Sequence, residues 1–165
     1  MQVWGDARLT RDADLTISSS VETGVGPLVE LITAAFESRV PDPVAFARQT
    51  RMILIRTSSG IDADLSLGMP GYEDEMFTRA IDVEFQPSRT LRVCSPEDMI
   101  IHKAVAGRAQ DETDIESVVI RQGDRLDATY IRKWLNSYAE ILVDERIVDR
   151  FERAWSKYKG AADEG

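Results

Sequence analysis

The chain has 165 residues, of which 43% are apolar and 30% are charged, and its formal net charge is −9. This size and composition are those of an ordinary globular protein, and no apolar run approaches the roughly 18 residues that a membrane span requires. An acidic surface repels phosphate backbones, which argues against broad nucleic-acid binding.

Cysteine and histidine usage limits the possible chemistry further. Cys94 and His102 are the only residues of their types. A lone cysteine makes no internal disulfide and suits a reducing, cytoplasmic compartment; the N-terminus has no signal-peptide pattern. One histidine excludes zinc sites built on several His or Cys ligands. Any metal site must therefore use oxygen donors, which favours Mg²⁺ or Mn²⁺.

Strands are expected mainly in the first half of the chain. Short alternating or apolar runs with β-branched residues predict them at 13–17, 52–56, 61–67, 81–85 and 91–94. The turn residues Ser58-Ser59-Gly60 predict that the second and third of these strands form a hairpin.

Helices are expected between these strands and after them. Apolar residues at helical spacing and start signals predict helices over 28–38, 72–80, 95–107, 112–121, 128–142 and 144–158. Strands early and helices late predict an α+β fold with a C-terminal helical segment. We expect one domain over residues 1–165, with an α/β core at 1–94 and helices at 95–160 packed on it.

Two Asp-x-Asp pairs enter predicted strands, at Asp12-Ala13-Asp14 and Asp62-Ala63-Asp64. Period-two spacing places both carboxylates of a pair on one face of a strand. Acids set between apolar strand residues need a reason, and metal binding is one. Simple solvation at the edge of a strand is the alternative.

The first pair lies in the segment Arg8-Leu9-Thr10-Arg11-Asp12-Ala13-Asp14, which resembles the Arg-x-Thr-x-Asp-hydrophobe-Asp signature of nucleotidyltransferases. In particular it is similar to the minimal nucleotidyltransferase and AbiEii-type abortive-infection toxin branch. Later segments resemble the family in order and spacing, at 64–68, 95–103 and 104–115. The resemblance covers about residues 3–134 and implies a nucleotidyltransferase-like mixed β-sheet flanked by helices.

The resemblance also implies roles for individual residues. Asp12, Asp14 and Asp64 would hold the Mg²⁺ or Mn²⁺ that bridges the phosphates of a nucleoside triphosphate. Asp64 would also draw the attacking hydroxyl toward the α-phosphorus. Asp62 shares the strand face of Asp64 and is the fallback for the third ligand.

Four further residues are implied to bind the nucleotide: Arg8, Thr10, Lys103 and Asp111. Lys103 is expected to point toward the same cleft as the carboxylates and to act there as a point charge. The alternative for Lys103 is a solvated helix residue. For Asp111 and Asp114 it is an acidic cluster that favours a helix N-terminus.

The family's upstream helix and Gly-Gly or Gly-Ser motif have no counterpart here, because Gly5 is followed by Asp6. We therefore expect weak nucleotide transfer, since backbone amides of that motif grip the triphosphate. The main hypothesis is an enzyme that moves a nucleotide to a hydroxyl on RNA, protein or a small molecule. The branch implies a toxin–antitoxin role, with a cognate antitoxin or a tRNA-like acceptor as partner. The alternatives are an inactive binding or regulatory module and a metal-dependent phosphohydrolase.

Overall fold

The structure is a computed structural model that describes residues 3–6, 12–17, 24–68 and 71–163. The chain divides into two compact units, and each is considered by itself. One unit, called here the sheet unit, comprises Leu9–Phe77. The other, called the helical unit, comprises Met1–Arg8 together with Thr78–Gly165.

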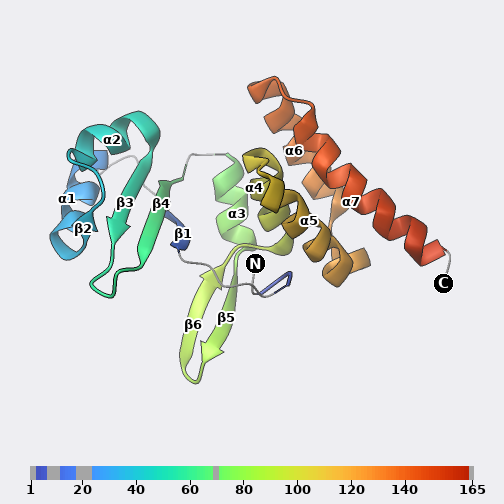
Figure 1. Ribbon diagram of the computed structural model, residues 1–165, viewed down its shortest axis with the longest axis horizontal. Coiled ribbons are helices and arrows are strands. Elements are labelled where there is room, and N and C mark those ends of the chain that lie inside the picture. The colour runs from blue at the N-terminus through green and yellow to red at the C-terminus, as the bar shows by residue number, and fades with distance from the viewer. Residues whose placement is uncertain (1–2, 7–11, 18–23, 69–70, 164–165) are drawn as a thin grey trace. The chain divides into compact units, whose positions relative to one another are not determined.

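The sheet unit is built on a four-stranded mixed sheet with the order β1-β4-β3-β2 (Figure 1). The strands are β1 (Asp12–Ile17), β2 (Glu37–Ser38), β3 (Met52–Arg56) and β4 (Asp62–Leu67). Strand β4 runs parallel to β1 and antiparallel to β3, and β3 is antiparallel to β2. The predicted hairpin between the strands at 52–56 and 61–67 is confirmed.

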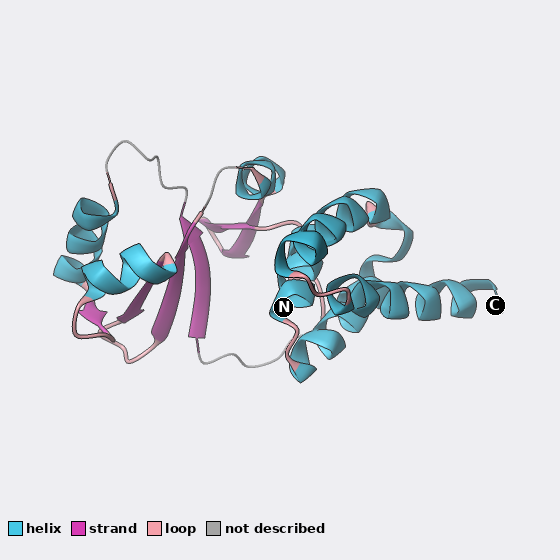
Figure 2. Cartoon of the chain, turned by 90° about the horizontal axis from the view of Figure 1, so that it is seen from above, coloured by secondary structure: helices cyan, strands magenta, loops and turns pink. Residues whose placement is uncertain are grey.

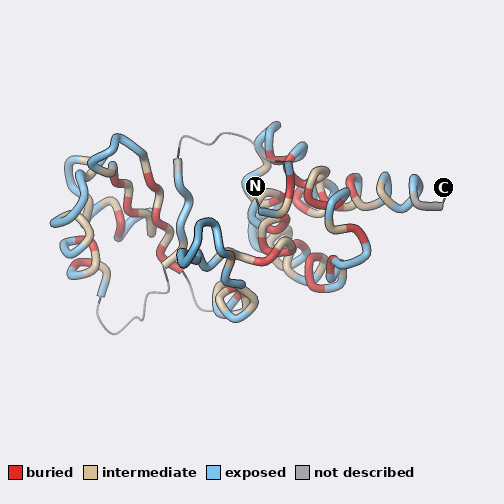
Figure 3. The backbone as a smooth tube through the Cα atoms, turned by 90° about the horizontal axis from the view of Figure 1, so that it is seen from below, coloured by how far each residue is buried: buried red, intermediate tan, exposed pale blue. Residues whose placement is uncertain are grey.

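Helices α1 (Val25–Ala35) and α2 (Pro43–Thr50) both lie on one face of this sheet (Figure 2). Buried and more exposed residues alternate along β3 and β4 (Figure 3). The buried set packs with the two helices into one apolar core, made of Val29, Ala47, Ile53, Ile55, Ala63, Leu65 and Leu67. The intervening residues of the strands therefore point to the face away from the helices.

The sequence prediction for residues 28–50 is only partly right. The first helix ends at Ala35 instead of continuing to residue 38, because Glu37 and Ser38 pair with β3 as a short edge strand. Helix α2 was not predicted, although its start follows a known pattern: Asp42 accepts a 2.9 Å hydrogen bond from the amide of Ala45, and Pro43 stands at the first helical position.

The helical unit holds the antiparallel hairpin of β5 (Ile81–Gln86) and β6 (Arg89–Val93), which pair as their own two-stranded sheet. Its helices are α4 (Pro96–Ala106), α5 (Ala109–Gln122), α6 (Ala128–Leu142) and α7 (Arg146–Asp163), with a short 3₁₀ turn, η2 (Gly123–Arg125). Helix α3 (Tyr72–Arg79) contains the boundary between the units.

The core of the helical unit is formed by fully buried side chains of four helices. They include Ile100, Ile115, Ile131, Leu135 and Phe151. Trp4 also belongs to this unit: its indole Nε1 donates to the Cys94 carbonyl at 2.8 Å, and its own carbonyl accepts from Gln122 at 3.2 Å. The α+β fold class with C-terminal helices is confirmed. In the described part of the chain, no helix is long and apolar enough to cross a membrane.

Candidate active site

The two Asp-x-Asp pairs open two neighbouring strands of the sheet unit. The parallel register of β1 and β4 places Asp12 beside Asp62 and Asp14 beside Asp64. Parallel neighbours at the same height point to the same face of a sheet, and neighbouring strands lie about 4.8 Å apart. Asp62 and Asp64 are partly exposed, whereas Ala63 and Leu65 between and after them are buried. The carboxylates of β4 therefore face away from the core.

The pairing of all four strands aligns residues in two rows across the sheet. One row runs Glu37, Arg56, Asp62, Asp12, from β2 to β1. In the second row Leu54, Asp64 and Asp14 are register partners, and the amide of Arg39 donates to the Leu54 carbonyl at 2.9 Å. Among the described side chains, the rows hold four carboxylates and two guanidiniums. Such an excess of negative charge attracts cations.

Asp62 is held most firmly by the strand beside it. Arg56, its register partner on β3, donates to both carboxylate oxygens, from Nε at 2.6 Å and from Nη2 at 3.2 Å. This hydrogen bonding is the main reason that the pKa of Asp62 is lowered from its ordinary value. Arg39 adds a further ion pair, with its Nε 3.4 Å from Asp62 Oδ2. Asp62 therefore stays ionised and is already neutralised by arginine.

Asp64 has a different environment. Its carboxylate accepts a hydrogen bond from Nη1 of Arg39, the same guanidinium that reaches Asp62. Among the described residues, Arg39 is the cation that forms an ion pair with Asp64. The side chain of Arg39 is 27% exposed and that of Asp64 is 33% exposed. Water and small ions can therefore reach this pair.

The donor chemistry of this face fits a hard divalent ion. Carboxylate oxygens on adjacent strands are the ligands that Mg²⁺ and Mn²⁺ prefer. Among the described side chains, no group of three His, Cys, Asp or Glu residues is gathered closely enough to hold an ion. The side chain of Asp12 is not among the described side chains. The predicted ligand set of Asp12, Asp14 and Asp64 remains a prediction.

The other predicted nucleotide-binding residues fall into two groups. Arg8 and Thr10 lie outside the described residues. Lys103 and Asp111 belong to the helical unit, where the Lys103 ammonium lies 3.0 Å from Asp111 Oδ1 and 3.0 Å from Asp114 Oδ2. The Lys103 side chain is only 14% exposed, so it is not the solvated helix residue that was the alternative.

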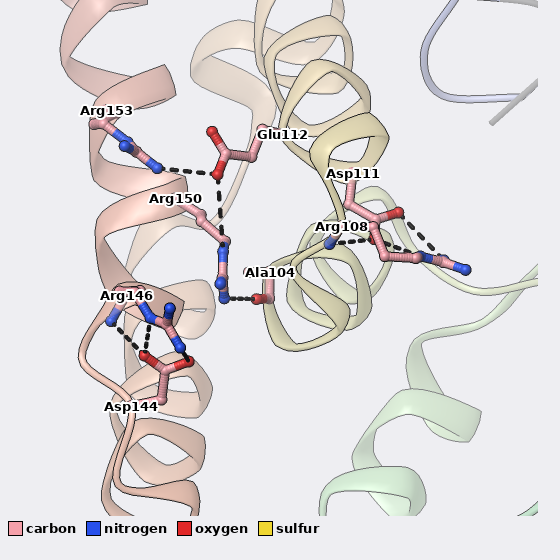
Figure 4. Close-up of polar contacts among 8 residues, drawn as sticks. All are labelled: Ala104, Arg108, Asp111, Glu112, Asp144, Arg146, Arg150 and Arg153. Carbon is pink, nitrogen blue, oxygen red and sulfur yellow. Dashed lines mark hydrogen bonds and ion pairs between the residues drawn. The ribbon is translucent and has the colours of Figure 1, made fainter.

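Asp111 closes the start of helix α5, as Figure 4 shows. Its carboxylate accepts from the Arg108 amide at 3.0 Å and from the Arg108 Nε at 2.8 Å. Burial alone raises the pKa of Asp111, but the hydrogen bonds from Arg108 and Lys103 outweigh it and lower the pKa. This capping role agrees with the alternative in which the acids serve the helix N-terminus.

Two arginines of this face were not identified from the sequence. Arg39 follows the short strand β2 and Arg56 ends β3, and neither belongs to a recognisable motif. Arg56 could have been identified from the sequence, because the predicted antiparallel hairpin of 52–56 with 61–67 already places it near Asp62. Arg39 could not have been identified in this way, since its position depends on the pairing of a two-residue strand that was predicted as helix.

Carboxylates on neighbouring strands of a mixed sheet are what the resemblance to nucleotidyltransferases implies, and β1 and β4 place Asp14 beside Asp64. Residues 6–162 match the family described as nucleotidyltransferase of unknown function (DUF6036), and the chain belongs to this family. No curated protein sequence matches the chain.

Proposed function

We propose that this protein is a metal-dependent nucleotidyltransferase that moves a nucleotide from a nucleoside triphosphate to a hydroxyl acceptor on RNA, protein or a small molecule. The observation that supports this most directly is the register of β1 and β4, which aligns Asp14 with Asp64 on the face away from the core. Membership of a nucleotidyltransferase family supports the reaction class.

In this proposal Asp12, Asp14 and Asp64 hold Mg²⁺ or Mn²⁺. When bound, the ion neutralises charge on the phosphate oxygens and so makes the α-phosphorus accessible to a nucleophile. Asp64 accepts a hydrogen bond from the acceptor hydroxyl and orients it. The hydroxyl oxygen then bonds to the α-phosphorus, the bond to the bridging oxygen breaks, and pyrophosphate leaves while the hydroxyl proton passes to solvent.

Arg8, Thr10, Lys103 and Asp111 remain the predicted nucleotide-binding residues. Lys103 requires a careful test, because its ammonium also neutralises two buried acids, Asp111 and Asp114. Removing one partner of a buried ion pair is strongly destabilising. A loss of activity in a Lys103 variant therefore supports a nucleotide contact only if the folded fraction is unchanged.

The resemblance to the AbiEii-type branch extends the proposal to a toxin–antitoxin role, with a tRNA-like acceptor or a cognate antitoxin protein as the partner. The second candidate function is a weakly active or inactive module that binds a partner. The observation that favours it is the pairing of Asp64 with Arg39, because a carboxylate that is already neutralised by arginine is a weaker metal ligand.

The test is incubation of the protein with each α-labelled nucleoside triphosphate, Mg²⁺ or Mn²⁺, total tRNA and the protein itself as acceptors. We expect labelled acceptor and released pyrophosphate, and a loss of about 100-fold or more in Asp14→Ala and Asp64→Ala. The control is Asp82→Asn, which removes an exposed acid of the β5–β6 hairpin and should change nothing.

Each other outcome indicates a different function. Nucleotide breakdown without labelled acceptor, still dependent on Asp14 and Asp64, would indicate a phosphohydrolase. No turnover with any acceptor, together with full folding, would favour the binding module. Transfer that survives both substitutions would show that these carboxylates are not the catalytic set.

A further inference from the structure

Arg39 is positioned by the backbone at the outer side of the sheet. It follows β2, and its amide continues the ladder by donating to the Leu54 carbonyl at 2.9 Å. Leu54 is in turn the register partner of Asp64 on β4. The backbone of Arg39 is thus separated from β4 by β3, and its guanidinium reaches across β3 to contact both Asp62 and Asp64.

The two acids depend on Arg39 to different degrees. Asp62 has a bidentate contact with Arg56 in addition to its longer contact with Arg39. Asp64 has the contact with Arg39, and the described residues provide no second arginine to it. If the guanidinium moved off Asp64, Asp62 would remain neutralised, whereas Asp64 would be left with both oxygens available to another cation.

We propose that Arg39 is the resident counter-cation of Asp64, which that carboxylate must exchange for the divalent ion. This inference rests on the proposed function, since it concerns the same metal. The Arg39 guanidinium occupies one of the lone-pair sites of the Asp64 carboxylate, and its charge repels a divalent cation bound to the same group. Arg39 therefore competes with the metal and is a positioning residue.

The exchange requires only a small movement of one side chain. Nε of Arg39 already lies 3.4 Å from Asp62 Oδ2, so the guanidinium can keep this partner when it releases Asp64. In the absence of metal the contact keeps the Asp64 carboxylate in a fixed position and offsets its charge. Metal affinity is consequently lower than the carboxylates alone would give.

The experiment measures binding of Mn²⁺ alone, by electron paramagnetic resonance and by calorimetry, to the full chain and its variants. Arg39→Gln should bind Mn²⁺ about tenfold more tightly than the wild type, because the competing charge is gone. Arg39→Lys keeps the charge and should stay within about threefold of the wild type. Circular dichroism melting confirms that each variant is folded.

Arg56→Gln is the matched control, because it removes the same charge from the same sheet face but from a residue whose partner is Asp62. We expect a change of less than about threefold. A double-mutant cycle isolates the contact itself: in an Asp64→Asn background, Arg39→Gln should have no further effect on Mn²⁺ affinity.

Three results would overturn the inference. An equal increase in Mn²⁺ affinity in Arg39→Gln and Arg56→Gln would show a general effect of the local charge. Unchanged Mn²⁺ affinity in Arg39→Gln would show that there is no competition, and weaker Mn²⁺ binding would show that Arg39 supports the metal. Failure of the proposed function looks different. In that case Asp14→Ala and Asp64→Ala would bind Mn²⁺ as the wild type does, or the wild type would bind none. There would then be no metal site at these carboxylates and no ion for Arg39 to compete with.

Discussion

Three aspartates of the helical unit are almost completely withdrawn from water, and donors surround each of them. Asp98 accepts from the Ser95 hydroxyl at 2.6 Å and from the Tyr130 hydroxyl at 2.8 Å. Asp111 and Asp114 share the ammonium of Lys103. A buried carboxylate without such partners would be very costly, so these contacts hold α4, α5 and α6 in one arrangement.

The lowered pKa of Asp111 predicts how stability depends on pH. Because the folded pKa lies below the unfolded value of about 3.9, the stabilisation is fully present above pH 4 and is lost as pH falls through the folded pKa. Asp111→Asn should cost about 2 kcal/mol at pH 7 and flatten the decline of the unfolding free energy below pH 4. Urea titrations of both proteins between pH 3 and 7 measure this; parallel pH profiles would contradict it.

A second prediction at this scale concerns Cys94. Burial raises the pKa of its thiol to about 11, so very little thiolate is present at pH 8. Reaction with a disulfide reagent at pH 8 should be about 100-fold slower in the folded chain than in guanidinium, where the pKa is about 8.5. The rate is followed by absorbance, and equal rates in the two conditions would show that the thiol is exposed and ionisable.

Several helix ends in this protein carry local capping signals, whereas Val143 ends α6 without one. Ser95, Asp42 and Asp127 accept hydrogen bonds from amides of the first turn, as capping residues do. Gly107 ends α4 in the left-handed conformation with φ of 62°, which costs glycine nothing. Val143 ends α6 with φ of 53°, although a β-branched residue is strained there.

Replacing Val143 should therefore stabilise the protein. Its side chain is 92% exposed, so little packing is lost, and Val143→Gly removes the steric strain. We expect a gain of about 1 kcal/mol, or about 3 °C in Tm. Val143→Ala is the control, because it keeps Cβ and should gain less. If calorimetry finds the glycine variant no more stable than the alanine variant, the strain argument is wrong.

At the scale of the whole molecule, the division into two units has a spectroscopic consequence. Trp4, Trp134 and Trp155 are all of the tryptophans in the sequence, and all belong to the helical unit. The Trp155 ring stacks on Phe151, with centroids 5.7 Å apart. Tryptophan fluorescence therefore reports on the helical unit, whereas amide hydrogen exchange of β3 and β4 reports on the sheet unit.

Core substitutions in the two units should separate these signals. Ile53→Ala removes a side chain at the centre of the sheet unit core and should lower the exchange protection of β3 and β4 by about 2–5 kcal/mol. Phe151→Ala should cost about 3–5 kcal/mol and shift the fluorescence midpoint instead. If both substitutions shift both signals equally, the two units unfold as one cooperative structure.

Much of the fold was predictable because its signals are local. The strands at 52–56 and 61–67, their turn, and the helix capped by Ser95 follow from alternation, turn residues and capping. The exception in the sheet unit is residues 36–38, where apolar spacing suggested that the first helix continues. There a pairing with β3 outweighs local propensity, and a sequence pattern does not contain that competition.

The candidate site divides in the same way. By itself the sequence indicated the class of protein, through its resemblance to nucleotidyltransferases, and the residue types of the acidic set. Asp-x-Asp spacing on a strand also fixes which side chains share a face. Only the tertiary structure decided that β1 lies parallel to β4, so that Asp14 stands beside Asp64, and that Arg39 neutralises one of these acids. Contacts between residues 25 or more positions apart depend on strand order and register, which arise from the packing of the whole sheet.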